Sequence, residues 1–136
     1  MNHTLDASAV LRYIDNEAGA DEVKQILLDA YNQQTELYMN TVNWSEIVYA
    51  FLKRGGVGAR SKIQQLDALP ITLVPVDEYL ASLAASYRLN FKLHLADSFA
   101  LATAGRSKST LVTGDFDFKN VKGPSVPSAI HFLPKK

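Results

Sequence analysis

Apolar residues alternate between strand spacing and helical spacing along nearly the whole chain. Short apolar runs predict strands that end at Asp6, over residues 36–39, 71–74 and 110–112, and near 130–132. Apolar positions at helical spacing predict helices over 9–15, from Gly19 onwards, over 44–54 and 57–69, after Asp77, and over 94–104. Because no Asn-Gly or Asp-Gly hairpin joins the five strands, we expect an α/β fold: a mainly parallel five-stranded sheet flanked by helices on both faces.

Capping and breaking residues mark the ends of these helices. Ser8 is a suitable N-cap for the first helix, and Asp77 for the helix after the third strand. Gly55-Gly56 and Gly105 follow helical segments, and Pro70 stops another. Because no linker, repeat or low-complexity tract interrupts this order, we expect residues 1–136 to form a single domain.

Composition narrows the class of protein. With 136 residues, 47% hydrophobic and 21% charged, the chain is typical of one globular domain rather than a disordered or coiled-coil protein. The absence of Cys excludes disulfides, Cys-ligated zinc, iron–sulfur clusters and thiol nucleophiles. No apolar run approaches the ~18 residues of a membrane span, and the N-terminus lacks the pattern of a signal peptide. We therefore expect a cytoplasmic protein without membrane association.

The charges balance in number but not in position. The chain carries 14 basic and 14 acidic residues, which argues against a non-specific nucleic-acid binder. Lys53, Arg54, Arg60 and Lys62 form a local basic stretch. This stretch is either a solvated edge or a surface that faces phosphate, and the sequence leaves the choice open.

Three acidic residues follow predicted strands. Asp6 ends the first strand, and Asp115 and Asp117 come just after the strand at 110–112. If residues 115–117 are extended, Asp115 and Asp117 point to the same side. Each acid alone is explained by turn or capping chemistry. However, ligands of open parallel sheets bind beyond the carboxyl ends of the strands, which is where all three fall.

Asp97 and Glu46 are acids on predicted helices. By helical spacing Asp97 lies within an apolar stripe, so its carboxylate needs a cation, hydrogen-bond donors or a metal, unless the helix is rolled to bring it to the rim. Glu46 lies opposite the apolar stripe of its helix, and its spacing from Asn43 fits a capping box with Asn43 as N-cap. Spacing alone therefore favours a functional role for the Asp97 carboxylate and a helix-capping role for Glu46.

A group of carboxylates gathered at one sheet edge needs a compensating cation. Like charges raise one another's pKa, and oxygen ligands suit Mg²⁺ or Mn²⁺. Such an ion polarises phosphoryl groups and activates water. The acids therefore indicate a metal-dependent phosphodiesterase site.

Four segments in order give the chain a family resemblance: residues 5–11, 43–46, 95–104 and 111–118. The chain resembles the PIN-domain nucleases, and most closely the small bacterial toxins of VapBC-type toxin–antitoxin pairs. The resemblance covers essentially the whole chain, and it favours a metal-site role for Glu46 over capping.

The resemblance implies a site and a reaction. Asp6, Glu46, Asp97 and Asp115, assisted by Asp117, would hold one or two Mg²⁺ or Mn²⁺ ions. Ser8 and Thr113 would orient carboxylates or water, with Asn43 beside Glu46 as a further supporting residue. The implied activity is that of an endoribonuclease toxin, which hydrolyses RNA phosphodiester bonds with a metal-activated water and leaves 5′-phosphate and 3′-hydroxyl ends. A cognate VapB-like antitoxin would inhibit it, a homodimer is the expected assembly, and tRNA or another structured RNA is the expected substrate.

Rival functions differ in the residues that they require. A non-catalytic RNA- or protein-binding module with the PIN fold would tolerate damaged acid positions, and none is damaged here. A receiver domain needs a phosphoacceptor Asp after the third strand, where Val74-Pro75-Val76 stands. A haloacid-dehalogenase-type phosphatase needs a second Asp in place of Ser8. Cleavage of DNA stays open, because a metal site does not read the sugar; RNA is favoured by family analogy.

Overall fold

Five parallel strands form the middle layer of the protein. The computed structural model describes residues 1–136. The strands are β1 (His3–Leu5), β2 (Leu37–Asn40), β3 (Thr72–Val74), β4 (Thr110–Thr113) and β5 (Ile130–Phe132). Their order is β3-β2-β1-β4-β5, and every neighbouring pair is parallel. The predicted parallel sheet is therefore confirmed.

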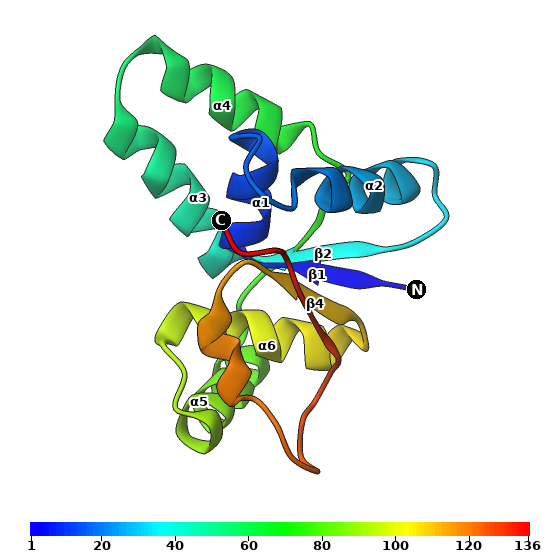
Figure 1. The fold of residues 1–136 in the computed structure, drawn as a ribbon. Coiled ribbons are helices and arrows are strands. Elements are labelled where there is room, and N and C mark those ends of the chain that lie inside the picture. Colours follow the sequence, from blue (N-terminus) through cyan, green and yellow to red (C-terminus); the bar gives the residue numbers. More distant parts are fainter.

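Helices cover both faces of this sheet (Figure 1). One layer holds α1 (Ala7–Ile14), α2 (Ala20–Tyr31), α3 (Thr41–Arg54) and α4 (Val57–Asp67). The opposite layer holds α5 (Glu78–Phe91) and α6 (Leu95–Ser107), with a short 3₁₀ helix, η1 (Phe116–Asn120), after β4. No helix is both long and apolar enough to cross a lipid bilayer.

The core follows from the alternation of side chains along the strands. Leu5, Met39 and Val112 face the layer of α1 to α4, whereas Leu111 faces α6. Residues 98–104 of α6 are buried all round its circumference, because this helix lies between the sheet and α5. Burial on every side leaves only the two ends of α6 able to present polar groups to solvent, and its first turn lies at the carboxyl edge of the sheet.

Two predicted N-caps are wrong, and for the same reason. The N-cap of α1 is Asp6, whose carboxylate accepts a hydrogen bond from the Ala9 amide at 2.9 Å, rather than Ser8. The N-cap of α3 is Asn40, which accepts from the Asn43 amide at 2.8 Å, so Asn43 lies inside the helix. In both places a polar residue at the end of the strand, Asp6 just after β1 and Asn40 as the last residue of β2, caps a helix that begins with the next residue. The Asp77 cap is confirmed by its bond to the Leu80 amide at 2.8 Å.

Two further local predictions fail through packing. Helix α6 continues past Gly105 to Ser107, so Gly105 does not end the helix; it lies against Pro127 instead, where a Cβ would be 3.0 Å from the ring. Residues 115–117 are not extended but enter η1, with Asp115 as its N-cap, accepting from the Asp117 amide at 2.9 Å.

The sheet order places a crevice beside β1 and β4. Strand order reverses between these two strands, and their carboxyl ends point to the same edge. Such a switch point is where open α/β sheets bind ligands. Asp6 follows β1 directly, and Asp115 follows β4 after one intervening glycine.

Candidate functional site

Three carboxylates meet at this edge of the sheet. One carboxylate oxygen each from Asp97, Asp115 and Asp117 lies within 4.8 Å of the other two. Asp97 comes from the first turn of α6, and the other two from the start of η1. Asp97 is half-buried rather than fully buried, because its place in the first turn carries it to the rim. The three sequence-predicted acids are thus brought together, although η1 rather than an extended segment aligns two of them.

Asp6 lies beneath this trio and is held by hydrogen bonds. Its Oδ1 accepts from the Ser8 hydroxyl at 2.7 Å and from the Ala9 amide, and its Oδ2 accepts from the Thr113 hydroxyl. The same hydroxyls accept from the next turn: Ser8 from the Gly114 amide at 2.8 Å, and Thr113 from the Asp115 amide at 2.9 Å. Ser8 and Thr113 therefore link the Asp6 carboxylate to the backbone that carries Asp115.

Glu46 reaches the site from α3. Its Oε1 accepts a hydrogen bond from the Asn43 side-chain amide at 3.0 Å, and the same amide donates to the Ala96 carbonyl at 3.1 Å. The Glu46 side chain is thus not committed to capping the backbone. Asn43 joins it to the peptide beside Asp97, which fixes α3 and α6 relative to one another at the site.

Burial and like charge raise the pKa values of these acids. Desolvation raises the pKa of Asp6 to about 6, with the Asp115 charge as a smaller contribution, while hydrogen bonds from Thr113, Ser8 and Ala9 oppose it. Desolvation and then the charges of Asp115, Asp6, Glu46 and Asp117 raise the pKa of Asp97 to about 7. Loss of hydration, followed by the Asp115 charge, raises the pKa of Glu46 against its bond from Asn43. All five acids thus interact electrostatically within one site.

The donor set fits a hard divalent cation. The groups around Asp97 that raise its pKa are all carboxylates, and no Lys or Arg forms a salt bridge with any of these acids. The imidazole of His94 approaches them, with its Nε2 3.7 Å from Asp117 Oδ2. Uncompensated carboxylates at this spacing favour Mg²⁺ or Mn²⁺, which bind oxygen ligands. The residues present therefore suit such an ion.

Sequence reasoning missed two residues at the site. Asn40 is fully buried and donates from Nδ2 to Asn43 Oδ1 at 2.9 Å and to Thr103 Oγ1 at 3.0 Å. The spacing of Asn40, Asn43 and Glu46, three residues apart, puts them on one side of a helical turn and could have revealed this chain of contacts. His94 had no recognisable signal, because its approach to Asp117 depends on how η1 packs.

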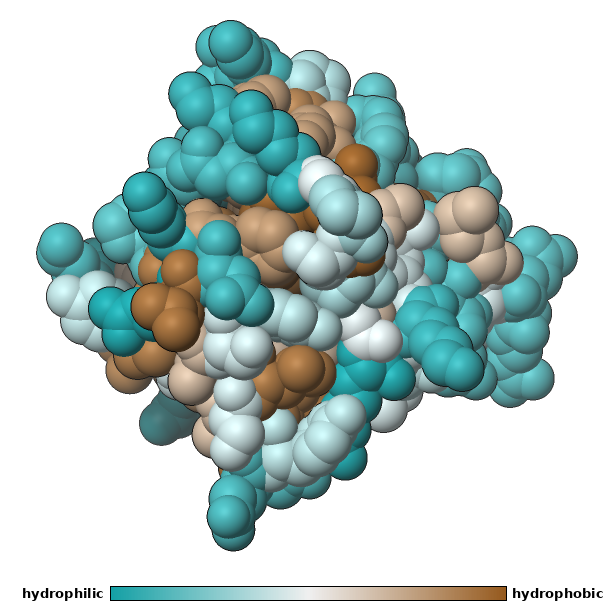
Figure 2. All heavy atoms as spheres, turned by 90° about the horizontal axis from the view of Figure 1, so that it is seen from below, coloured by the Kyte–Doolittle hydropathy of each residue, from teal (hydrophilic) through white to brown (hydrophobic).

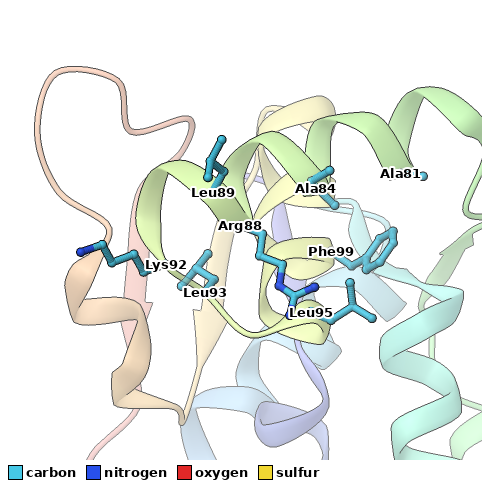
Figure 3. Close-up of a pocket in the computed structure, with 9 residues that line it drawn as sticks. Ala81, Ala84, Arg88, Leu89, Lys92, Leu93, Leu95 and Phe99 are labelled. Atoms are coloured by element: carbon cyan, nitrogen blue, oxygen red, sulfur yellow. The ribbon is translucent and has the colours of Figure 1, made fainter.

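The apolar face of α5 and α6 is separate from these acids. Figure 2 views the molecule from this side and shows apolar patches among polar groups. In the groove of Figure 3, Leu95 and Phe99 of α6 and Arg88 of α5 project toward the same space. The residues that line the groove include no Asp, Glu, His, Ser or Thr, and its only charged side chains are the bases Arg88 and Lys92.

A comparison with protein families identifies the domain. The profile of the PIN domain matches residues 4–124, which is most of the chain. The chain belongs to the PIN-domain family. This PIN domain contains every acid of the candidate site within the matched residues. No curated protein sequence matches the chain.

Solved structures share the architecture of this PIN domain. VapBC2 from Rickettsia felis, bound to a DNA fragment from its promoter, has a TM-score of 0.75 at 15% identity, covering 98% of this chain and 100% of that chain. A toxin–antitoxin complex from Klebsiella pneumoniae has a TM-score of 0.67 at 21% identity, covering 94% and 99%. VapBC-5 from Mycobacterium tuberculosis, of the VapBC family of toxin–antitoxin systems, has a TM-score of 0.67 at 16% identity, covering 96% and 98%. At these identities the likeness establishes the fold.

Proposed function

We propose that this PIN domain is a Mg²⁺- or Mn²⁺-dependent endoribonuclease toxin. The observation that carries the proposal is the meeting of Asp97, Asp115 and Asp117 within 4.8 Å of one another, above a buried Asp6 and beside Glu46. Four separate segments contribute these acids. Burial raises the pKa of Asp6 to about 6, and burial together with the neighbouring carboxylates raises the pKa of Asp97 to about 7. A bound cation would offset the repulsion between these carboxylates and favour their ionised forms.

The acids of the site would take different roles in hydrolysis. A bound Mg²⁺ or Mn²⁺ supplies Lewis-acid polarisation of the phosphodiester and activation of water. Asp97, Asp115 and Asp117 would hold the ion, while Asp6 supports it from below through its bonds to Ser8 and Thr113.

Glu46 is suited to proton transfer. It lies at the open side of the site, its pKa is raised, and Asn43 fixes one of its oxygens by a hydrogen bond of 3.0 Å. We assign it to accept a proton from the attacking water, or to share the cation with the three aspartates. In-line attack of water on phosphorus, with the P–O3′ bond breaking and the O3′ oxygen leaving as a hydroxyl, would leave 5′-phosphate and 3′-hydroxyl ends.

The partners of the toxin follow from its relatives. The similar structures include complexes of toxins with antitoxins, which supports a cognate VapB-like antitoxin that blocks the acidic site. A homodimer is proposed on the family resemblance. RNA, with tRNA and other structured RNAs first among the candidates, is proposed as substrate over DNA on the same basis.

The deciding experiment is cleavage of end-labelled nucleic acids by purified, antitoxin-free protein. tRNA, other structured RNAs and single-stranded DNA are each incubated with Mg²⁺, Mn²⁺ or EDTA. Asp97→Asn tests the site, and Asp67→Asn is the matched control, because Asp67 is an exposed acid at the end of α4. We expect discrete cuts in RNA that need the metal, persist in Asp67→Asn and fall by at least about 100-fold in Asp97→Asn.

Other outcomes separate the alternatives. Cuts that persist in Asp97→Asn would contradict the site assignment. Folded protein that binds RNA but cuts nothing in any arm would favour a non-catalytic PIN-fold binding module. Cleavage of the DNA arm alone would overturn RNA as the substrate.

A further inference from the structure

We propose that Arg12 is a positioning residue, which ties the turn that carries Asp115 to the C-terminal segment 133–136 and thereby sets the geometry of the acidic site. The inference rests on the proposed metal-dependent function. Arg12 lies in the last turn of α1, and only 5% of its surface is exposed. It is the one Lys or Arg among the buried residues of the chain.

Its guanidinium binds backbone carbonyls from three separate segments. Nη1 donates to the Ala18 carbonyl, in the loop after α1, at 3.0 Å, and also to the Pro134 carbonyl in the C-terminal segment. Nη2 donates to the Gly114 carbonyl at 3.0 Å. A buried guanidinium is costly to desolvate, and its planar fork fixes the directions of all its partners. Since no carboxylate pairs with Arg12, its three bonds serve to fix backbone segments relative to one another.

The Gly114 contact is the one that reaches the active site. A Cβ at this position would lie 2.5 Å from Arg12 Nε, so any larger residue here would push the guanidinium out of its place. The Gly114 carbonyl is held by Arg12, and its amide donates to Ser8 at 2.8 Å. Both polar groups of the residue just before Asp115 are therefore fixed. The placement of the Asp115 carboxylate depends on this turn.

The C-terminal segment packs on the same turn. The Leu133 amide donates to the Thr113 carbonyl at 2.8 Å, which extends the β4–β5 ladder to the edge of the site. Phe132 stacks on Phe116, the residue after Asp115, with ring centroids 5.5 Å apart. Lys136 pairs with Glu17 at 3.1 Å. Arg12 is the side chain that joins this segment to the Gly114 turn through hydrogen bonds.

A purely structural Arg12 would have different consequences from a positioning one. If Arg12 only stabilised the fold, its loss would reduce the fraction of folded protein, and each folded molecule would bind metal normally. If it positions Asp115, folded molecules would bind metal more weakly. A metal titration under conditions in which circular dichroism shows each variant to be fully folded separates these cases, because a change in Kd then reports the site geometry and not the folded fraction.

The test is Mn²⁺ binding by EDTA-stripped protein, followed by isothermal titration calorimetry, with circular dichroism to confirm folding. The variants are Arg12→Met, Arg12→Lys and Gly114→Ala; the last keeps Arg12 but forces it away from the turn. The control is Arg54→Met, because Arg54 also joins two helices, through a surface pair with Asp15 at 2.8 Å. We expect Arg12→Met and Gly114→Ala to weaken Mn²⁺ binding by about tenfold, as for other residues that orient metal ligands. We expect Arg12→Lys to be intermediate and Arg54→Met unchanged.

The outcomes distinguish this inference from the proposed function. Wild-type Mn²⁺ affinity in Gly114→Ala and in either Arg12 variant, even with fewer sites per chain, would overturn the positioning role. Should Arg12→Met not fold, the other two variants carry the test. A wild-type protein that binds Mn²⁺ but cleaves no nucleic acid contradicts the nuclease and leaves the Arg12 comparison valid, whereas one that binds no Mn²⁺ overturns both.

Discussion

Among single residues, Asp97 is the acid whose charge the site opposes most. Its pKa rises to about 7 through desolvation first, and then through the neighbouring carboxylates. Asp97→Asn removes this charge with little change of shape. In metal-free buffer at about pH 8 we expect the Tm to rise by roughly 2–5 °C, because like-charge repulsion is relieved.

The measurement is thermal unfolding of wild type and Asp97→Asn in EDTA, and again in Mg²⁺. Added Mg²⁺ should raise the Tm of the wild type and not that of the variant. A clear loss of Tm in EDTA would show that Asp97 is chiefly structural.

Thr113 binds the carboxylate of Asp6, the other acid whose pKa is raised well above its usual value. Its hydroxyl donates to Asp6 and accepts from the Asp115 amide, and the side chain is fully buried. We expect Thr113→Val to lower the free energy of unfolding by about 1–3 kcal/mol at about pH 8. The loss should shrink at about pH 5, because the Asp6 carboxylate, with a pKa of about 6, is then largely protonated.

Thr4→Val is the matched control for this prediction. Thr4 is equally buried, but its hydroxyl bonds to Ser109 at 2.7 Å and has no carboxylate partner. Chemical denaturation at both pH values should therefore show a pH-dependent loss for Thr113→Val alone. Equal losses at the two pH values for Thr113→Val would contradict the assigned role.

At the scale of elements, strand ends and helix starts share residues. Asp6 follows the last residue of β1 and caps α1, and Asn40 is the last residue of β2 and caps α3. Each side chain is thus fixed by two elements at once. This sharing explains why the acids and their supports meet at one edge: a cap residue at a parallel strand end necessarily lies at the carboxyl edge of the sheet.

Asn40→Asp tests the junction of β2 and α3. The variant keeps an oxygen to cap the Asn43 amide but loses the Nδ2 donors to Asn43 Oδ1 and Thr103 Oγ1. We expect a loss of about 2–3 kcal/mol in the free energy of unfolding, because a buried charge replaces a donor. Cleavage should also fall, because Asn43 orients Glu46.

Asp77→Asn is the control for Asn40→Asp, because it makes the opposite exchange at another helix cap. Asp77 caps α5 through the Leu80 amide at an exposed position, where the exchange keeps the capping oxygen. Asp77→Asn should change the free energy of unfolding much less than Asn40→Asp does, since the pair of Asp77 with Arg106 is solvated. Urea denaturation of both variants makes the comparison, and similar losses in the two would show that Asn40 acts only as a cap.

At the scale of the whole molecule, the acidic site makes the free energy of unfolding depend on pH. The pKa values of Asp6 and Asp97 rise from 3.8 to about 6 and about 7, so the folded state binds protons more tightly than the unfolded state. Metal-free stability should therefore fall as pH rises from about 5 to about 8. Burial lowers the pKa of His3, which opposes the trend, but this one group acts against three acids with raised pKa values: Asp6, Glu46 and Asp97.

We expect the free energy of unfolding to fall by on the order of 2 kcal/mol over this pH range. The figure is smaller than the pKa shifts alone would give, because the Asp97 carboxylate is partly open to solvent. Denaturant titrations in EDTA across this pH range measure it, with the same series in Mg²⁺ as the comparison. Mg²⁺ should remove most of the decline by favouring the ionised acids. A stability that rises with pH in EDTA would contradict the raised pKa values.

Much of the fold and the positions of the acids could be predicted from the sequence. The period of apolar residues is a local property, so it gave the order of strands and helices and the parallel sheet. Asp97 stood out because a charge interrupts an apolar stripe. The caps at Ser8 and Asn43 were wrong because a cap depends on where the strand ends, and strand ends are decided by pairing with neighbours such as β4.

By itself, then, the sequence determined which elements form and which acids follow the strands, because backbone periodicity and turn chemistry act over a few residues. Only the tertiary structure decided that Asp97 and Asp115 share a site, that Asn43 joins Glu46 to α6, and that Arg12 binds Gly114 and Pro134. Some of these partners lie more than 100 residues apart along the chain. Their contacts arise from the packing of the layers, which no local pattern encodes.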